Sequence, residues 1–118
     1  MKRIMLKAKL HNARVTETNV DYEGSLALDE ELMQAADLRA FEKVDIYNVS
    51  NGERFSTYLI KAESGSRKVA VLGAAAHKAA AGDRLIVASY VALDEEEIDF
   101  FMPKILILDD DNKVIDIK

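Results

Sequence analysis

Cysteine is absent from this chain of 118 residues, proline occurs once, as Pro103, and there are only five glycines. Without cysteine the chain can form no disulfide, no thiolate nucleophile and no Cys-ligated zinc site, which fits a reducing compartment. No apolar run approaches the roughly 18 residues that a membrane-spanning helix needs. The stretch Met1–Arg14 interleaves charged with apolar side chains, unlike a secretory signal. We therefore expect a cytoplasmic protein with no membrane partner.

Positive charge is also scarce relative to negative charge. The chain has 16 Lys+Arg against 21 Asp+Glu, a formal net charge of −5, and no basic block. Nucleic-acid binding needs clustered Lys and Arg, so the composition argues against this class of function, and we expect no nucleic-acid partner. With 49% hydrophobic and 31% charged residues the composition is that of a folded globular protein. No Pro/Gly/Ser-rich linker divides the chain, and we expect a single domain over residues 1–118.

Short β-type runs dominate the sequence. Runs rich in apolar and β-branched residues predict seven strands, at Ile4–Leu10, Ala13–Val20, Val44–Val49, Phe55–Ile60, Lys68–Leu72, Leu85–Val91 and Ile105–Leu108. Asn51-Gly52 predicts a hairpin turn because both residues tolerate positive φ, and Gly65 marks another turn. Many short strands with closely spaced turns indicate a small barrel or sandwich rather than a parallel βαβ fold.

Helices are expected to be few and short. Asp29 is placed to cap a helix in which Leu32, Ala35 and Ala36 share one face. A second helix is predicted over Ala74–Ala81, closed by Gly82, and a third over Asp94–Phe100. In so small a barrel much apolar surface stays exposed, and self-association would cover it.

Ordinary catalytic motifs are missing. His11 and His77 are far apart and have no metal-ligand spacing, so each is interpreted as a structural or surface histidine. There is no GxSxG elbow and no phosphate-binding glycine loop. The acidic runs 94–97 and 109–111 are most simply a helix start and a turn, although a carboxylate metal site stays open.

Four segments together carry a resemblance. They are Met5–His11 (MLKAKLH), Tyr22–Ser25 (YEGS), Asn51–Tyr58 (NGERFSTY) and Gly73–His77 (GAAAH). Alone, Gly-Ser between a strand and a capped helix is a turn. In combination, in this order and at this spacing, the segments resemble bacterial aspartate 1-decarboxylase, a pyruvoyl-dependent lyase, from Met1 to about Pro103.

The resemblance implies a zymogen that cuts its own backbone. The cut falls between Gly24 and Ser25, giving a β chain 1–24 and an α chain 25–118. The Ser25 hydroxyl attacks the Gly24 carbonyl to form an ester, and elimination and hydrolysis leave a pyruvoyl cofactor at position 25. Glycine suits the first position because it adopts strained backbone and leaves its carbonyl open. Thr57 is the candidate for polarising that carbonyl.

The same resemblance implies the reaction. L-Aspartate forms a Schiff base with the pyruvoyl group, loses CO₂ and is released as β-alanine for pantothenate biosynthesis, with no metal. Tyr58 stands where a family tyrosine protonates the carbanion. Because tyrosine phenols have pKa values of about 10 in water, such a group holds its proton at neutral pH.

Substrate binding is implied for charged and for small residues. Arg54 offers a planar fork for a carboxylate and Lys9 a compact positive charge. Thr57, together with the backbone of Gly73, Ala74 and Ala75, would complete the site. Taken alone, Arg54 and Lys9 would be interpreted as surface charges, and Gly73–Ala75 as the start of a helix.

The family also implies a double-psi β-barrel, assembled as a homotetramer with sites between neighbouring subunits. One departure stands out, because Leu72 occupies the position before Gly-Ala-Ala-Ala where the family usually has asparagine. An alternative is therefore an uncleaved, non-catalytic β-barrel interaction module. A transcription regulator of the swapped-hairpin barrel type would need a basic face, which the net charge of −5 disfavours.

Overall fold

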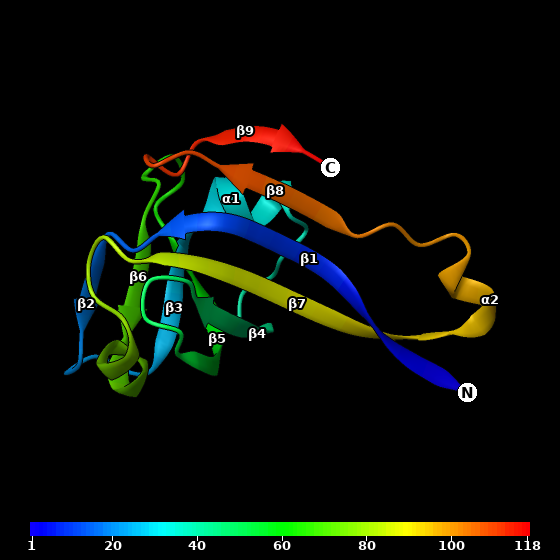
Figure 1. Cartoon of the computed structure of the whole chain (residues 1–118), viewed down its shortest axis with the longest axis horizontal. Coiled ribbons are helices and arrows are strands. Elements are labelled where there is room, and N and C mark those ends of the chain that lie inside the picture. The colour runs from blue at the N-terminus through cyan, green and yellow to red at the C-terminus, as the bar shows by residue number, and fades with distance from the viewer.

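Two long strands, β1 (Lys2–Arg14) and β7 (Arg84–Asp94), pair antiparallel along the long axis of the molecule in the computed structural model, which describes residues 1–118 (Figure 1). The remaining strands are β2 (Glu17–Asn19), β3 (Ser25–Asp29), β4 (Lys43–Asn48), β5 (Arg54–Ala62), β6 (Val69–Leu72), β8 (Lys104–Leu108) and β9 (Val114–Ile117). Three short helices accompany them, α1 (Glu30–Ala35), the 3-10 helix η1 (Gly73–Lys78) and α2 (Glu95–Ile98). None of these helices has the length and apolar character needed to cross a membrane.

The nine strands follow the order β2-β6-β3-β5-β4-β7-β1-β8-β9. Three pairs are parallel (β1 with β8, β2 with β6, β3 with β5) and the other five are antiparallel, so strands distant in the sequence become neighbours. This mainly β arrangement confirms the expected fold class, the double-psi β-barrel. Its functional consequence is that β3, β5 and β6 lie side by side.

The core is formed where the strands turn alternate residues inward. One leucine from each of β1, β3, β5, β7 and β8 is fully buried, namely Leu10, Leu26, Leu59, Leu85 and Leu106. Burial of a leucine side chain contributes about 1.5–3 kcal/mol to the free energy of unfolding. This layer of leucines therefore helps to fix the register of the strands.

Asp29 joins the first helix to a distant loop. Its buried carboxylate accepts the backbone N–H of Glu31 at 2.9 Å, of Gly65 at 2.9 Å and of Arg67 at 2.7 Å. The first of these bonds is the predicted helix cap, which is confirmed. The other two bind the β5–β6 turn, where Gly65 has a φ of 82°.

The single strand predicted over Ala13–Val20 is wrong. β1 ends at Arg14 and β2 begins at Glu17, because the chain changes partners between them. The N–H of Val15 donates to the carbonyl of Asp83, whereas that of Thr16 donates to the carbonyl of Val69.

Two predicted helices are shorter than expected. Instead of Ala74–Ala81 the structure has η1, which ends where the side-chain amides of Asn48 and Asn51 donate to the carbonyl of Lys78 at 3.1 and 2.9 Å. Instead of Asp94–Phe100 it has the single turn α2. The strands β3 and β9 were not predicted at all.

A half-buried carboxylate fixes the loop between α1 and β4. Glu42 accepts hydrogen bonds from the ammonium of Lys7 at 3.0 Å, from the hydroxyl of Ser89 and from the backbone N–H of Arg39 at 3.1 Å. Burial by itself would raise the pKa of Glu42, but the bonds from Ser89, Lys7 and Arg39 outweigh it and hold the pKa below its ordinary value of 4.5.

This lowered pKa predicts acid sensitivity. The unfolded chain binds the proton of Glu42 more readily than the folded one, so the free energy of unfolding should fall as the pH drops below about 4.5. Urea denaturation between about pH 3 and pH 6 should show that Glu42→Gln removes part of this slope. The exposed Glu96→Gln should keep the slope of the unmodified chain. Equal slopes in all three proteins would contradict this assignment.

Candidate active site

A cleft of about 430 Å³ lies beside the start of β3. Its walls are formed by Gly24, Phe55, Ser56, Thr57, Tyr58, Ala74, Ala75 and Lys78. The fold thus brings the expected cleavage residues Gly24 and Thr57 together with Tyr58 and with the small residues of η1. In the sequence these groups belong to three separate segments.

Strand pairing explains how they meet. β3 runs parallel to β5 with Leu26 opposite Leu59. Continuing this register back by one residue at a time places Ser25 beside Tyr58 and Gly24 beside Thr57. Two of the predicted functional residues, Thr57 and Tyr58, therefore adjoin the bond between positions 24 and 25.

Ser25 is the first residue of β3 and is only 1% exposed. Its hydroxyl donates to the carbonyl of Glu23 at 3.4 Å. Ordinary O–H···O bonds measure about 2.5–3.0 Å, so this hydroxyl is held loosely, directly beside Gly24. A hydroxyl with this weak attachment is free to turn toward the neighbouring carbonyl.

Gly73 packs against Gly24 with no room for a side chain. A Cβ at position 73 would lie 2.4 Å from the Cα of Gly24, 2.6 Å from its nitrogen and 2.8 Å from the carbonyl oxygen of Tyr22. Gly73 also has a φ of 71°, which glycine adopts without strain. Residues 22–24 are therefore braced by the first residue of η1.

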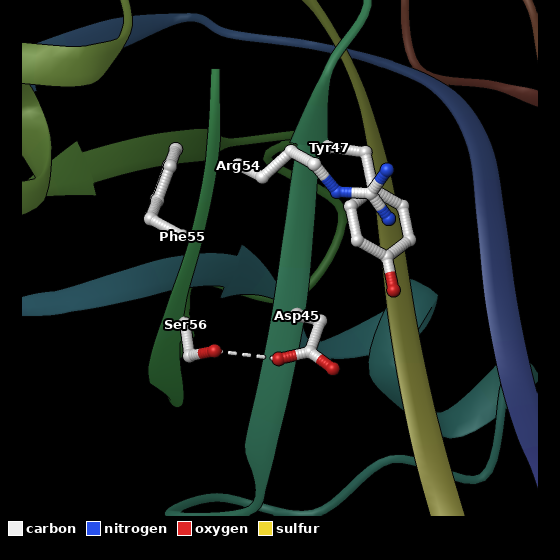
Figure 2. A pocket seen from close by; sticks show the side chains of 5 residues that line it. All are labelled: Asp45, Tyr47, Arg54, Phe55 and Ser56. Carbon is white, nitrogen blue, oxygen red and sulfur yellow. Dashed lines mark hydrogen bonds between the residues drawn. The ribbon is translucent and has the colours of Figure 1, made fainter. Parts of the chain in front are cut away.

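Arg54, on the same strand as Thr57 and Tyr58, lines a second hollow of about 300 Å³ (Figure 2). Its guanidinium lies 4.1 Å from the centre of the Tyr47 ring, a cation–π contact. Next to it, the hydroxyl of Ser56 donates to the carboxylate of Asp45 at 2.6 Å. Phe55 and Ser56 line both hollows, so the Arg54 site and the Gly24 cleft adjoin.

Tyr47 is held from its other end as well. Its hydroxyl and that of Tyr90 are hydrogen-bonded at 2.8 Å. This bond, with burial and the nearby charge of Asp45, raises the pKa of Tyr90 to about 12. Tyr90 therefore stays protonated at neutral pH, and its hydrogen bond to Tyr47 holds the ring on which Arg54 rests.

Lys9 is not part of the cleft. It lies half-buried on β1, opposite Ala88 of β7 and Ile105 of β8. In the sheet, β7 and β4 separate β1 from β5. Within one chain the structure does not bring Lys9 to Gly24 and Ser25.

Leu72 lies directly opposite Ser25 in the antiparallel pair of β6 and β3. Opposed residues of neighbouring strands share a face of the sheet. The Leu72 side chain is 7% exposed and packs with Ala27 and Ala70 in a small cluster outside the main core. An apolar side chain thus lies next to Ser25, on the same face of the sheet.

Several residues of the site were not identified from the sequence. Asp45 and Tyr47 were missed because a two-residue hairpin at Asn51-Gly52 would set Val49 opposite Arg54, whereas the actual loop is longer and sets Tyr47 there. Lys78, which is paired with Glu53 at 2.9 Å, carried no signal.

The acidic run 94–97 spans the end of β7 and the start of α2, and Asp109 binds the N–H groups of Asp111 and Lys113 in a turn, as expected. No three His, Asp or Glu side chains come together as metal ligands would.

Comparison with known proteins agrees with this geometry. A family described as aspartate decarboxylase matches residues 1–115. Aspartate 1-decarboxylase of Ralstonia nicotianae is 52% identical over 118 residues, covering 100% of this chain and 98% of the relative. The protein of the same name from Saccharophagus degradans is 54% identical over 110 residues, covering 93% and 87%, and that from Cupriavidus necator is 48% identical over 118 residues, covering 100% and 98%. With its cleft, strand order and full-length similarity, the chain belongs to the aspartate decarboxylase family.

Proposed function

We propose that this protein cleaves itself between Gly24 and Ser25 and then decarboxylates L-aspartate to β-alanine and CO₂, as a pyruvoyl-dependent enzyme that supplies pantothenate biosynthesis in the cytoplasm. The observation that carries the proposal is the cleft in which Gly24 meets Thr57 and Tyr58. Gly73, packed on Gly24, braces the bond to be cut.

Cleavage needs only groups that the chain itself provides and one water molecule, which enters at the hydrolysis step. The Ser25 oxygen bonds to the Gly24 carbonyl carbon while the C–N bond breaks, giving an ester and a free amine. Loss of the Ser25 α-proton expels the Gly24 carboxylate and leaves a dehydroalanine, whose hydrolysis releases ammonia and leaves a ketone. The oxyanion of the first step needs a donor, and Thr57, in the same cleft as Gly24, is assigned that role.

The residues present fit a group generated at position 25. Ser25 is buried, and a Cβ placed on Gly24 would meet no atom within 4 Å. Once formed, the pyruvoyl group supplies a ketone that binds the substrate amine and accepts the electron pair left by CO₂. Tyr58 borders this position and holds the proton that the substrate carbon must receive.

Arg54 is assigned to a substrate carboxylate. Its guanidinium is planar by delocalisation, and the contact with the Tyr47 ring fixes the orientation of that plane, so the group is preorganised for two parallel bonds. The backbone at Gly73, Ala74 and Ala75 is assigned to the other side of the substrate. Ala74 and Ala75 line the cleft, and larger side chains there would fill it.

The proposal includes a homo-oligomer, a tetramer by family resemblance. Lys9 binds substrate in this scheme, and because it lies away from the cleft of its own chain, it would act at the site of a neighbour. The large apolar side chains exposed near α2 support association, since Ile4 is 78%, Phe100 91% and Met102 82% exposed.

A second candidate function rests on Leu72. Because an apolar side chain faces Ser25 where an amide would offer a hydrogen bond, the chain could remain uncut and act as a non-catalytic interaction module. Chain scission distinguishes this alternative from the enzyme.

The proposed function predicts that Ser25 is indispensable. Purified protein incubated with L-aspartate should form β-alanine, followed by proton NMR, and Ser25→Ala should form none because no ketone can arise. The chain contains a matched control, since Gly65-Ser66 is a second Gly-Ser pair in an exposed turn. Ser66→Ala should retain full activity. β-Alanine formation by the Ser25→Ala protein would exclude the pyruvoyl mechanism.

Gly73→Ala should block maturation. The added Cβ forces residues 22–24 to move, and displacement of reacting groups by about 1 Å costs about 100-fold in rate. Gly82→Ala introduces the same backbone strain, at a φ of 91°, but its Cβ meets nothing within 4 Å. Gel analysis over time should show slow scission in Gly73→Ala and normal scission in Gly82→Ala. Equal rates in the two variants would show that the contact with Gly24 is irrelevant.

Leu72→Asn should accelerate self-cleavage, because the amide would lie on the same face as Ser25 and could hydrogen-bond to the reacting groups. Leu72→Ala removes the apolar bulk without adding an amide and should cleave no faster than the unmodified chain. If Leu72→Asn changes neither the rate of scission nor that of decarboxylation, the leucine does not limit maturation.

A further inference from the structure

Phe41 has a backbone conformation that is unusual for its side chain. It lies between α1 and β4 with a φ of 71°, in the left-handed region that glycine and asparagine tolerate best. Its ring is 77% exposed, so burial of apolar surface does not offset this strain. A bulky aromatic residue in this position needs another explanation.

The strained conformation is imposed by β5. The N–H of Phe41 donates to the carbonyl of Leu59 at 2.7 Å, and the N–H of Leu59 donates to the carbonyl of Glu42 at 3.0 Å. Two residues thus face one, as in a β-bulge, whose first residue in the glycine type is left-handed. The network of Glu42, Lys7 and Ser89 holds the next residue in place. These hydrogen bonds hold the loop in place beside Tyr58.

In this loop the ring of Phe41 packs against the ring of Tyr58. The two ring centres are 6.3 Å apart with an angle of 35° between their planes. Aromatic pairs attract at about 4.5–7 Å. Tyr58 is 38% exposed and lies at the edge of the cleft, with Thr57 as its neighbour. Without Phe41 this side of the Tyr58 ring would face water.

We propose that Phe41 is a positioning residue, which holds the Tyr58 ring at the edge of the cleft and shields one side of it from solvent. The inference rests on the proposed function, in which the Tyr58 phenol delivers a proton to the substrate. Phe41 does not reach the cleft itself. The fold tolerates the backbone strain at position 41, and the Tyr58 phenol is thereby held in place and partly shielded from water.

The test is Phe41→Asn, which relieves the strained backbone and removes the ring. The melting temperature should rise by roughly 2–5 °C. At the same time kcat should fall about 3- to 10-fold with KM unchanged, because the loss affects the proton-delivery step rather than substrate binding. Tetranitromethane should nitrate Tyr58 faster by a similar factor, measured peptide by peptide by mass spectrometry. Phe41→Tyr keeps the ring and should match the unmodified chain in kcat and in nitration.

The outcomes are separable. A higher melting temperature with unchanged kcat and unchanged Tyr58 nitration would overturn the proposal, leaving Phe41 as a strained surface residue. If the unmodified protein forms no β-alanine, the proposed function fails and with it the role in proton delivery. The nitration measurement, which needs no turnover, still decides whether Phe41 shields Tyr58.

Discussion

The site depends on one close contact, between the backbones of Gly73 and Gly24. A side chain at position 73 would come within 2.4 Å of Gly24, so no other residue fits there without moving the chain. Gly73 is fixed in turn, because Leu72 before it is paired with Ser25 and η1 follows it. The bond between Gly24 and Ser25 is therefore braced from one side, while its other side faces the cleft.

β5 organises everything else around that bond. Its residues alternate across the sheet, so Thr57 lies beside Gly24 whereas Arg54 and Ser56 meet Tyr47 and Asp45 of β4. One strand thus contributes to the cleft beside Gly24, where the bond rearrangement is proposed, and to an adjoining charged hollow, suited to a carboxylate. The loop carrying Phe41 is hydrogen-bonded to the same strand at Leu59. Distances along β5 set the geometry between the reacting bond, the proton donor and the cation.

The sequence predicted those features that depend on local chemistry. The Asp29 cap, the Asn51-Gly52 turn and the mainly β fold were all found this way. β3 was missed because every residue of Ser25–Asp29 is buried and no alternation marks it, whereas β9 was missed because all of its residues are exposed. The position of Lys9 outside the cleft depends on the strand order, which no local pattern contains. Phe41 gave no warning, since phenylalanine seldom adopts a positive φ.

The fold should direct scission to the Gly24-Ser25 bond and leave the second Gly-Ser bond, Gly65-Ser66, intact. The most direct measurement is the intact mass of the purified protein under denaturing conditions, before and after treatment with borohydride. We expect fragments 1–24 and 25–118, with the larger one gaining the mass of two hydrogen atoms on reduction of its terminal ketone. Scission at Gly65-Ser66, or a single species of 13.1 kDa that never cleaves, would contradict the account.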